Sequence, residues 1–251
     1  MAPSKRVLWR LSNTMLENAI LLTGAGQRLG LFHAERILDR GWPLIVTYRT
    51  PRPSVERLAA RGAVVLQADL FTLQGIEGLI AQVQAHAASL RAIIHNASFW
   101  PTDAELAADP SLFDALMNLH VRTPWRLNDA LAPLLYATSA PFADIIHITD
   151  TTITKGSAKR AAYIASKAAL DSLTRSFAAR LAPKVKVNSI APGLILFNAG
   201  DDEAYRQDRL RRSALGYEPG AMVVWQAIDG LLANGFITGQ SLAVDGGRNV
   251  K

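Results

Sequence analysis

Short apolar runs alternate along the chain with longer amphipathic segments from residue 19 to residue 245. Apolar runs bounded by Gly, Pro, Asn or Asp are typical of buried strands, whereas apolar residues three or four positions apart are typical of helices. The pattern predicts strands at residues 19–23, 43–48, 63–68, 92–95, 145–149, 185–191 and 241–245, with helical segments that include residues 112–136, 163–181 and 225–232. Strands that alternate with helices predict an α/β fold.

The chain of 251 residues shows no internal repeat, linker or break in composition, which predicts a single domain over residues 19–251. Residues 1–18 carry three basic side chains but neither a sustained apolar stretch nor a small-residue cleavage site. We therefore expect a disordered leader there and not a signal peptide. No apolar run is long enough to cross a membrane, so we expect no membrane contact.

Composition and charge exclude several kinds of site and partner. Hydrophobic residues make up 49% of the chain, which is enough for one large core. The absence of cysteine excludes disulfides and thiolate metal sites, agrees with a cytoplasmic protein, and leaves no metal site expected. The net charge is +6, but the arginines are scattered and few aromatics lie among them, so we do not expect nucleic-acid binding. A phosphate-rich cofactor or an anionic substrate accounts for the charge equally well.

A glycine-rich segment separates the first predicted strand from the first helix. Gly24, Gly26 and Gly30 follow the strand at 19–23. Glycines allow close backbone approach, and a helix N-terminus presents free N–H groups, so a strand–turn–helix of this kind predicts a nucleotide phosphate cradle. The spacing departs from the common G-x-G-x-x-G fingerprint, and by itself it is a weak signal.

The end of the second predicted strand favours one cofactor. An acidic residue there would bind the adenosine ribose of NAD, but Arg49 and Thr50 stand there, with Arg52 close by. This favours a 2′-phosphate and hence NADPH. The alternative is a solvated loop arginine.

Two further positions remain open. Asn96, Ala97 and Ser98 follow the strand at 92–95, where small residues would let the backbone pass beside a cofactor. Trp100 is interpreted either as a core or rim aromatic or as a stacking wall for a flat substrate. His120 lies on a long helical segment, where a lone histidine is more often structural than catalytic.

The strongest chemistry lies between residues 149 and 167. Asp150 falls at the carboxyl end of the strand at 145–149, the edge at which open α/β sheets bind ligands. Tyr163 and Lys167 are four residues apart, so a helix would place both on one face. We expect the lysine cation to lower the tyrosine pKa and make the phenol a proton donor or acceptor near neutral pH.

In combination, these motifs resemble the short-chain dehydrogenase/reductase family over nearly the whole chain. The matching segments are the Thr23-Gly24…Gly30 loop, Asp69, Asn96-Ala97, Tyr163 with Lys167, Pro192-Gly193 and Asp245-Gly246-Gly247. The resemblance implies a single-domain, Rossmann-type doubly wound parallel sheet of about seven strands, NAD(P)(H) at the strand ends, and a homotetramer.

Three departures from the family pattern indicate one branch of it. Asp150 takes the place of the usual serine, Arg28 that of a loop glycine, and His120 that of an asparagine. The first two resemble the pteridine reductases, and the third, with the residue 95–100 and 192–198 stretches, resembles the bacterial dihydromonapterin reductases. This resemblance implies NADPH-dependent reduction of a 7,8-dihydropterin to the tetrahydropterin, with dihydrofolate as a further substrate.

The resemblance also implies a set of site residues. The catalytic group would be Tyr163, Lys167 and Asp150. The cofactor would be bound by Gly24, Gln27, Arg28, Leu29, Gly30, Tyr48, Arg49, Thr50, Asp69, Leu70, Asn96, Ala97, Ser98, Tyr163, Lys167, Pro192 and Gly193. The substrate would be bound by Arg28, Ser98, Trp100, Asp150, Tyr163 and Leu194.

Two other functions remain as alternatives. One is a carbonyl reductase acting on a ketone, against which Asp150 in the serine position counts. The other is a non-catalytic NADP-binding protein, against which the intact Tyr163 and Lys167 count. A carboxylate at 150 would hold the donor-rich edge of a pterin or supply a proton through water. Residues 194–215 are interpreted as a loop with short helices that closes over the site.

Overall fold

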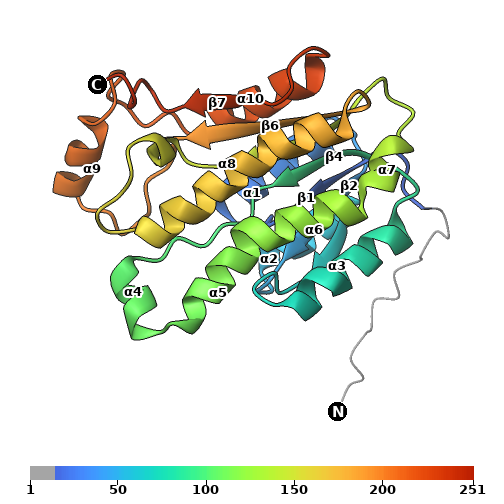
Figure 1. Ribbon diagram of the computed structural model, residues 1–251, viewed down its shortest axis with the longest axis horizontal. Coiled ribbons are helices and arrows are strands. Elements are labelled where there is room, and N and C mark those ends of the chain that lie inside the picture. The colour runs from blue at the N-terminus through green and yellow to red at the C-terminus, as the bar shows by residue number, and fades with distance from the viewer. Residues whose placement is uncertain (1–14) are drawn as a thin grey trace.

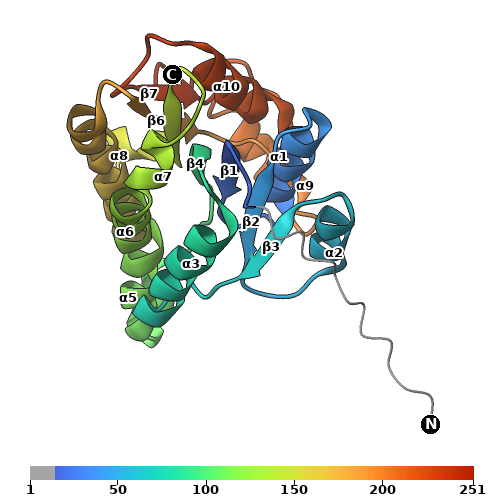
Figure 2. The same cartoon turned by 90° about the vertical axis from the view of Figure 1, so that its right-hand side faces the viewer.

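The computed structural model describes residues 15–251 and has three layers, a parallel sheet between two layers of helices (Figure 1 and Figure 2). Within these residues the sheet has seven strands in the order β3-β2-β1-β4-β5-β6-β7, all parallel. The strands are β1 (Ala19–Leu22), β2 (Leu44–Tyr48), β3 (Val64–Gln67), β4 (Leu90–His95), β5 (Ala143–Ile148), β6 (Val185–Pro192) and β7 (Ser241–Val244). The expected doubly wound sheet is confirmed.

The helices cover both faces of the sheet. They are α1 (Arg28–Asp39), α2 (Pro53–Ala60), α3 (Leu73–His86), α4 (Asp103–Ala108), α5 (Ser111–Met117), α6 (Thr123–Ala130), α7 (Ala132–Tyr136), α8 (Ala161–Leu181), α9 (Glu203–Leu210) and α10 (Met222–Ala233). A π-helical turn, η1 (Asn118–Arg122), joins α5 to α6, and a 3₁₀ turn, η2 (Thr151–Thr154), follows β5.

Strands β1, β4, β5 and β6 in the middle of the sheet are largely buried on both sides because helices cover both faces. One core cluster joins the sheet to α3, α6 and α8, and a second joins it to α1, α2 and α10. Strands β1, β4 and β5 are buried along their full length, with the exception of Arg91 in β4. Near-continuous apolar runs are the pattern expected of a parallel sheet, and they explain why these strands were predictable.

The strand order reverses between β1 and β4. The loops that follow these two strands therefore diverge at the carboxyl edge of the sheet, where doubly wound folds bind ligands. The strand arrows in Figure 1 point toward this edge, and α9 and the C-terminus lie at the same end of the molecule.

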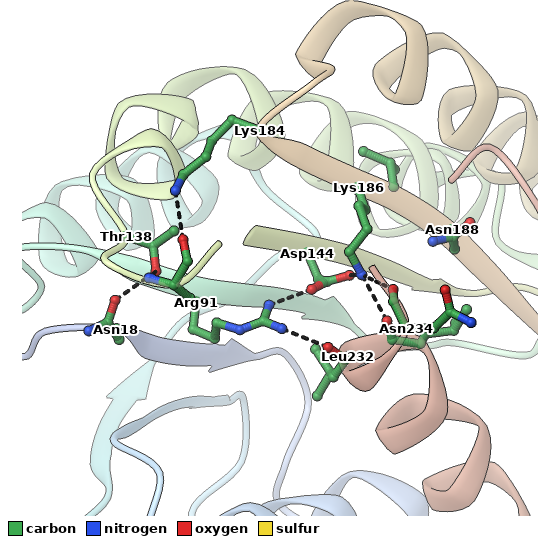
Figure 3. Close-up of polar contacts among 12 residues, drawn as sticks. Asn18, Arg91, Thr138, Asp144, Lys184, Lys186, Asn188, Leu232 and Asn234 are labelled. Carbon is green, nitrogen blue, oxygen red and sulfur yellow. Dashed lines mark hydrogen bonds and ion pairs between the residues drawn. The ribbon is translucent and has the colours of Figure 1, made fainter. Parts of the chain in front are cut away.

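The opposite, amino edge of the sheet holds a buried ion cluster (Figure 3). Asp144 of β5 is fully buried and forms ion pairs with Arg91 of β4 and with Lys186 of β6, the latter at 2.7 Å. The two cations also donate to main-chain carbonyls at the end of α10: Arg91 to Leu232, and Lys186 to Leu231 and Asn234. This cluster fastens the C-terminus of α10 to three strands, since cations are favourable at a helix C-terminus.

The predicted leader lies partly outside the described residues, which begin at residue 15. Within the described part, Leu16 pairs with Ala87 in a parallel β-bridge. The Asn18 amide nitrogen of the main chain donates to Ser89 Oγ at 2.8 Å, and its side chain accepts from Thr138 at 2.6 Å. Residues 16–18, which we expected to be disordered, are thus bonded to the amino edge of the sheet.

Candidate active site

The glycine-rich loop has the geometry of a phosphate cradle. Gly24 has φ of 73°, and a Cβ there would lie 2.7 Å from Ala97 Cα. A Cβ on Gly30 would lie 2.1 Å from the Gly24 carbonyl oxygen. Both contacts are shorter than real Cβ contacts, so only glycine lets the loop turn and lets α1 begin directly beneath it. Arg28, the first residue of α1, also has a positive φ of 51°.

The loop after β1 is bonded to the loop after β4 across the point where the strand order reverses. Asn96 Nδ2 donates to the carbonyl oxygens of Thr23 and Gly24, at 3.0 and 3.1 Å. The main-chain amides of Asn96 and Ala97 both donate to Thr23 Oγ1 at 3.0 Å. Asn96 and Thr23 therefore hold the cradle open at a fixed width.

A pocket of about 190 Å³ opens beside the cradle at the ends of β1, β2, β3 and β4. Of the predicted cofactor residues, those that line it are Gly24, Gln27, Tyr48, Arg49, Thr50, Leu70, Ala97 and Ser98. Sequence reasoning missed the apolar part of the lining, which includes Phe71, Phe99 and Leu119. The Arg49 guanidinium lies over the Phe71 ring, 4.3 Å from its centre, and Arg52 lines the same pocket. No acidic residue lines the pocket, so its cations are free to meet a phosphate.

Other predicted cofactor residues lie outside this pocket. Asp69 is exposed, and its carboxylate accepts from the Phe71 amide at 3.1 Å, so it orders the loop that carries Phe71. Gly193 follows β6, and a Cβ there would lie 2.9 Å from Asp245 Cα. Glycine is needed at that position because the chain after β7 crosses it. Leu29, Gly30 and Pro192 belong to the elements that frame the cradle and the end of β6.

The three predicted catalytic residues lie together. Asp150 lies two residues after β5 and caps η2, accepting from the Thr152 amide at 2.7 Å. Tyr163, on α8, donates its hydroxyl proton to Asp150 Oδ2 at 3.2 Å. Lys167, one turn further along α8, donates from Nζ to the Ile148 carbonyl at 2.8 Å. Tyr163 and Lys167 are buried, whereas Asp150 is half-buried and so is accessible to water.

The expected lowering of the Tyr163 pKa is wrong. Burial, and then the neighbouring Asp150 carboxylate, raise the pKa of Tyr163 well above its ordinary value, and a hydrogen bond with Ser98 only partly opposes this. Lys167 Nζ lies 5.9 Å from the centre of the Tyr163 ring and bonds to a carbonyl of β5. Helical spacing brought the two side chains to one face, but the phenol donates to the Asp150 carboxylate, whereas the ammonium donates to the Ile148 carbonyl.

Burial also acts on Lys167. It lowers the pKa of this lysine to about 8, and Asp150 opposes the shift. Burying an ammonium with a single hydrogen bond disfavours its charged form. A proton on Lys167 is therefore held loosely for a lysine, directly beneath the tyrosine.

His120 lies in the π-helical turn η1 and is fully buried, at the centre of a hydrogen-bonded chain. Its Nε2 lies 3.3 Å from the main-chain N–H of Phe99, which can only donate, and 3.0 Å from Ser98 Oγ. Its Nδ1 lies 2.8 Å from Ser166 Oγ, and Ser166 donates its own proton to the Tyr163 carbonyl at 2.7 Å. Nε2 is thus the acceptor and Nδ1 carries the proton.

The charge state of His120 agrees with this chain. Burial, and then the Lys167 cation, lower its pKa well below the ordinary value, so the ring is neutral at neutral pH. Its ring also meets the Tyr163 ring edge-on, 5.6 Å between centres. His120 therefore connects the loop after β4 to α8 and fixes where Ser98 and Tyr163 stand. Its substitution for asparagine was visible in the sequence, but its partners were not.

Trp100 and Arg28, two of the predicted substrate residues, contact residues other than Asp150, Tyr163 and Lys167. Trp100 is half-exposed, and the Arg160 guanidinium lies over its ring at 3.7 Å from the centre. Arg28 donates to Asn198 and to the Leu196 carbonyl, so the glycine-rich loop is bonded to the segment that follows β6. That segment begins near Leu194 and continues into α9, as the interpretation of loops with short helices predicted.

Residues 15–251 contain no group of three or more His, Asp or Glu side chains arranged to hold a metal ion. No helix in the same range is long and apolar enough to cross a membrane.

Known proteins resemble this chain closely in sequence and fold. Residues 24–249 match the protein family described as enoyl-(acyl carrier protein) reductase. Dihydromonapterin reductase from Klebsiella pneumoniae is 48% identical over 232 residues, which cover 92% of this chain and 97% of that protein. The Escherichia coli enzyme of the same name is 46% identical over the same share of each chain.

A solved structure agrees with these matches. Alternative dihydrofolate reductase 1 (FolM) from Brucella canis, complexed with NADP, has a TM-score of 0.83 and 28% identity, covering 93% of this chain and 94% of that one. Because the family match spans residues 24–249 and the relatives align over nearly their full length, this chain belongs to the short-chain dehydrogenase/reductase family of oxidoreductases and is a homologue of dihydromonapterin reductase.

Proposed function

We propose that this protein reduces 7,8-dihydropterins with NADPH, taking dihydromonapterin to tetrahydromonapterin and accepting dihydrofolate as a further substrate. Relatives at 46–48% identity are named for the first reaction, and structural neighbours for the second. The observation that carries the proposal is the hydrogen bond from Tyr163 to Asp150 at the carboxyl edge of the sheet. A carboxylate there suits a nitrogen heterocycle, whereas a serine hydroxyl would suit a ketone.

The cradle and the pocket fit NADPH. Glycine is required at 24 and 30, where the backbone would meet the pyrophosphate, and Arg49 with Thr50 lines the part of the pocket suited to a 2′-phosphate. When bound, NADPH supplies the hydride. The Phe71 ring beneath Arg49 restricts the guanidinium to that part of the pocket, since a stacked arginine loses less side-chain freedom on binding.

This cofactor choice has a direct test. Arg49→Asp replaces a phosphate partner with a like charge, so the Kd for NADPH should rise by at least about tenfold while the Kd for NADH changes little. Titration of both cofactors by fluorescence measures this. Equal losses for the two would show that Arg49 does not recognise the 2′-phosphate.

The charge states of the site indicate which residue donates the proton to the substrate. Tyr163 keeps its proton at neutral pH because its pKa is raised, so its hydroxyl is a donor to the substrate ring nitrogen. Asp150, half-buried, orients that hydroxyl and gives access to water, from which the proton is replaced. Ser98 and His120 position the hydroxyl from the other side, through the loop after β4.

The substrate class is tested at Asp150. Asp150→Ser should lower kcat/KM for dihydromonapterin by roughly tenfold or more, since an unpaired buried polar edge costs about 1–3 kcal/mol. NADPH affinity should stay unchanged. If the protein were a ketone reductase, the same change would be neutral or beneficial toward a test ketone. A variant with full pterin activity would remove the main support for a pterin substrate.

We also propose that the protein is a homotetramer and acts in the cytoplasm. Edge strand β7 is largely exposed along its length, with Leu242 at 44%, and an exposed edge strand is favourable to cover with a second copy. Light scattering coupled to size-exclusion chromatography gives the mass directly. A monomer at micromolar concentration would contradict the assembly.

A further inference from the structure

A second pocket, of about 240 Å³, is lined only by cationic side chains. They are Lys155, Arg211, Arg212, Arg248 and Lys251, which we name the basic pocket. They come from η2 and its C-cap, from the end of α9, and from the residues after β7. Three segments, each at least 36 residues from the next along the chain, thus place five positive charges around one space.

The charges of the basic pocket are poorly balanced. Asp208 forms an ion pair with Arg212 at 2.6 Å, and the other four cations form no ion pair with an Asp or Glu of residues 15–251. Lys155 instead donates to the Arg248 carbonyl oxygen at 2.7 Å and, at 3.3 Å, to an oxygen of the carboxyl group of Lys251, the last residue. Burial, and then Arg209 and Arg212, lower the pKa of Arg248, and Asp150 and Asp245 only partly oppose this. Clustering of like charges costs free energy, and an anion placed in the pocket would remove that cost.

The basic pocket adjoins the catalytic group. The Thr151 side chain, next to Asp150, donates to Asp245 at 2.8 Å and accepts from Asn249 at 2.6 Å. Thr154, at the end of η2, donates to Asn249 at 3.2 Å. These bonds fasten the segment that carries Arg248 onto η2, whose N-cap is Asp150. The basic pocket therefore lies next to Asp150, the acid that faces the substrate.

The pocket lies on the opposite side of the catalytic group from the cofactor pocket. The cofactor pocket is formed at the ends of β1 to β4, whereas the basic pocket is formed by segments that follow β5, β6 and β7. No residue lines both. An anion bound there would accordingly belong to the substrate and not to the cofactor.

We propose that the basic pocket binds the glutamate carboxylates of dihydrofolate and so determines how well this protein accepts a charged dihydropterin. Arginine binds carboxylates with charge-assisted, frequently bidentate hydrogen bonds. Dihydromonapterin has an uncharged side chain and does not use the pocket. This inference rests on the proposed function, because it assigns the side-chain subsite of the same active site.

The test compares the two substrates in variants of the basic pocket at saturating NADPH. The double variant Arg211→Gln with Arg248→Gln should raise KM for dihydrofolate about tenfold, given the usual strength of charge-assisted bonds. Its kcat/KM for dihydromonapterin should stay within about twofold of the wild-type value. Arg211→Glu, at an exposed position that tolerates substitution, should show the same selectivity with an intact fold. Arg57→Gln, an exposed arginine of α2, is the matched control and should change neither substrate.

The outcomes separate this inference from the proposed function. An unchanged KM for dihydrofolate in both pocket variants would overturn the assignment of the pocket, and so would equal losses for the two substrates. Wild-type protein that reduces dihydromonapterin but not dihydrofolate would also overturn it, while leaving the proposed reduction of dihydromonapterin intact. Wild-type protein that reduces neither substrate would overturn the proposed function itself.

Discussion

Two buried lysines at opposite edges of the sheet have different surroundings. Lys186, at the amino edge, bonds to the Asp144 carboxylate and to two main-chain carbonyls, each within 2.8 Å. Lys167, at the carboxyl edge, has one recorded hydrogen bond among the described residues, to the Ile148 carbonyl. Both side chains are nearly inaccessible, at 5% and 1% exposure. Burial lowers the pKa of Lys167 to about 8.

The difference separates stability from chemistry. A buried cation whose three donors are all used contributes to the fold, and removing it leaves charged or polar partners behind. A buried cation with few partners can exchange its proton near physiological pH, which is useful in a site that moves protons. The two edges of one sheet therefore use the same residue type for opposite purposes, and four predictions test that separation.

The largest effect is expected at the carboxyl edge. Tyr163→Phe keeps the ring that packs on His120 but removes the oxygen that carries the proton. General acid–base groups contribute about 10²–10⁴-fold, so kcat should fall by that order while NADPH binding stays nearly intact. Stopped-flow hydride transfer together with a cofactor titration measures both. A variant within threefold of wild type would show that Tyr163 is structural.

The two lysines are then compared directly. Lys186→Met leaves Asp144 without one of its cations and the end of α10 without its donor, so the free energy of unfolding should fall by about 3–5 kcal/mol. Lys167→Met should instead lower kcat, by about 10²-fold, with little loss of stability. Urea denaturation and steady-state kinetics on both variants give the comparison. Equal losses of stability would mean that Lys167 is as structural as Lys186.

A third buried ionisable side chain, His33, contributes to the response to acid. His33 is fully buried, and neither ring nitrogen has a hydrogen-bond partner among the described residues; burial lowers its pKa to about 4. The unfolded chain takes up that proton near pH 6.5, so the stability contribution is complete above pH 6.5 and is lost as the pH falls toward 4. At pH 5 this proton uptake lowers the free energy of unfolding by about 2 kcal/mol.

The matched variants for this effect are His33→Leu and His86→Gln. His33→Leu fills the same site without a titrating group. Between pH 7 and pH 5 its free energy of unfolding should therefore fall by about 2 kcal/mol less than that of the wild type. His86→Gln, at a half-exposed position, should follow the wild-type curve. Parallel curves for wild type and His33→Leu would show that His33 does not titrate in this range.

The smallest effect is expected at His120. Because the ring is neutral, it positions its neighbours and does not carry the proton. His120→Asn keeps an acceptor and a donor but cannot span from Phe99 to Ser166, so kcat should fall by less than about tenfold. In His120→Leu, which loses both hydrogen bonds, kcat should fall further, while KM for NADPH stays unchanged. A loss beyond about 100-fold in His120→Asn would indicate a proton relay through the imidazole.

Local features made much of the fold and of the cofactor side predictable. Apolar runs located the strands because a parallel sheet buries both faces, and Gly24 and Gly30 were identifiable because their turn excludes a Cβ. The absence of an acidic residue after β2 was visible in the sequence. Helix α2 was not predicted, since it begins at Pro53, directly after the end of that strand. The π-helical turn at His120 was also missed, because the pattern of its residues is that of an ordinary α-helix.

The sequence by itself indicated the strands of the sheet, the glycine-rich loop and the shared helix face of Tyr163 and Lys167, because each depends on residue spacing within one segment. The proposed role of Asp150 came from its place after a strand and from the resemblance to the pteridine reductases. The tertiary structure decided the direction of the Tyr163 pKa, the partners of His120 and the gathering of the basic pocket. The physical reason is that desolvation and charge interactions depend on every atom nearby, and those atoms come from segments that lie far apart in the chain.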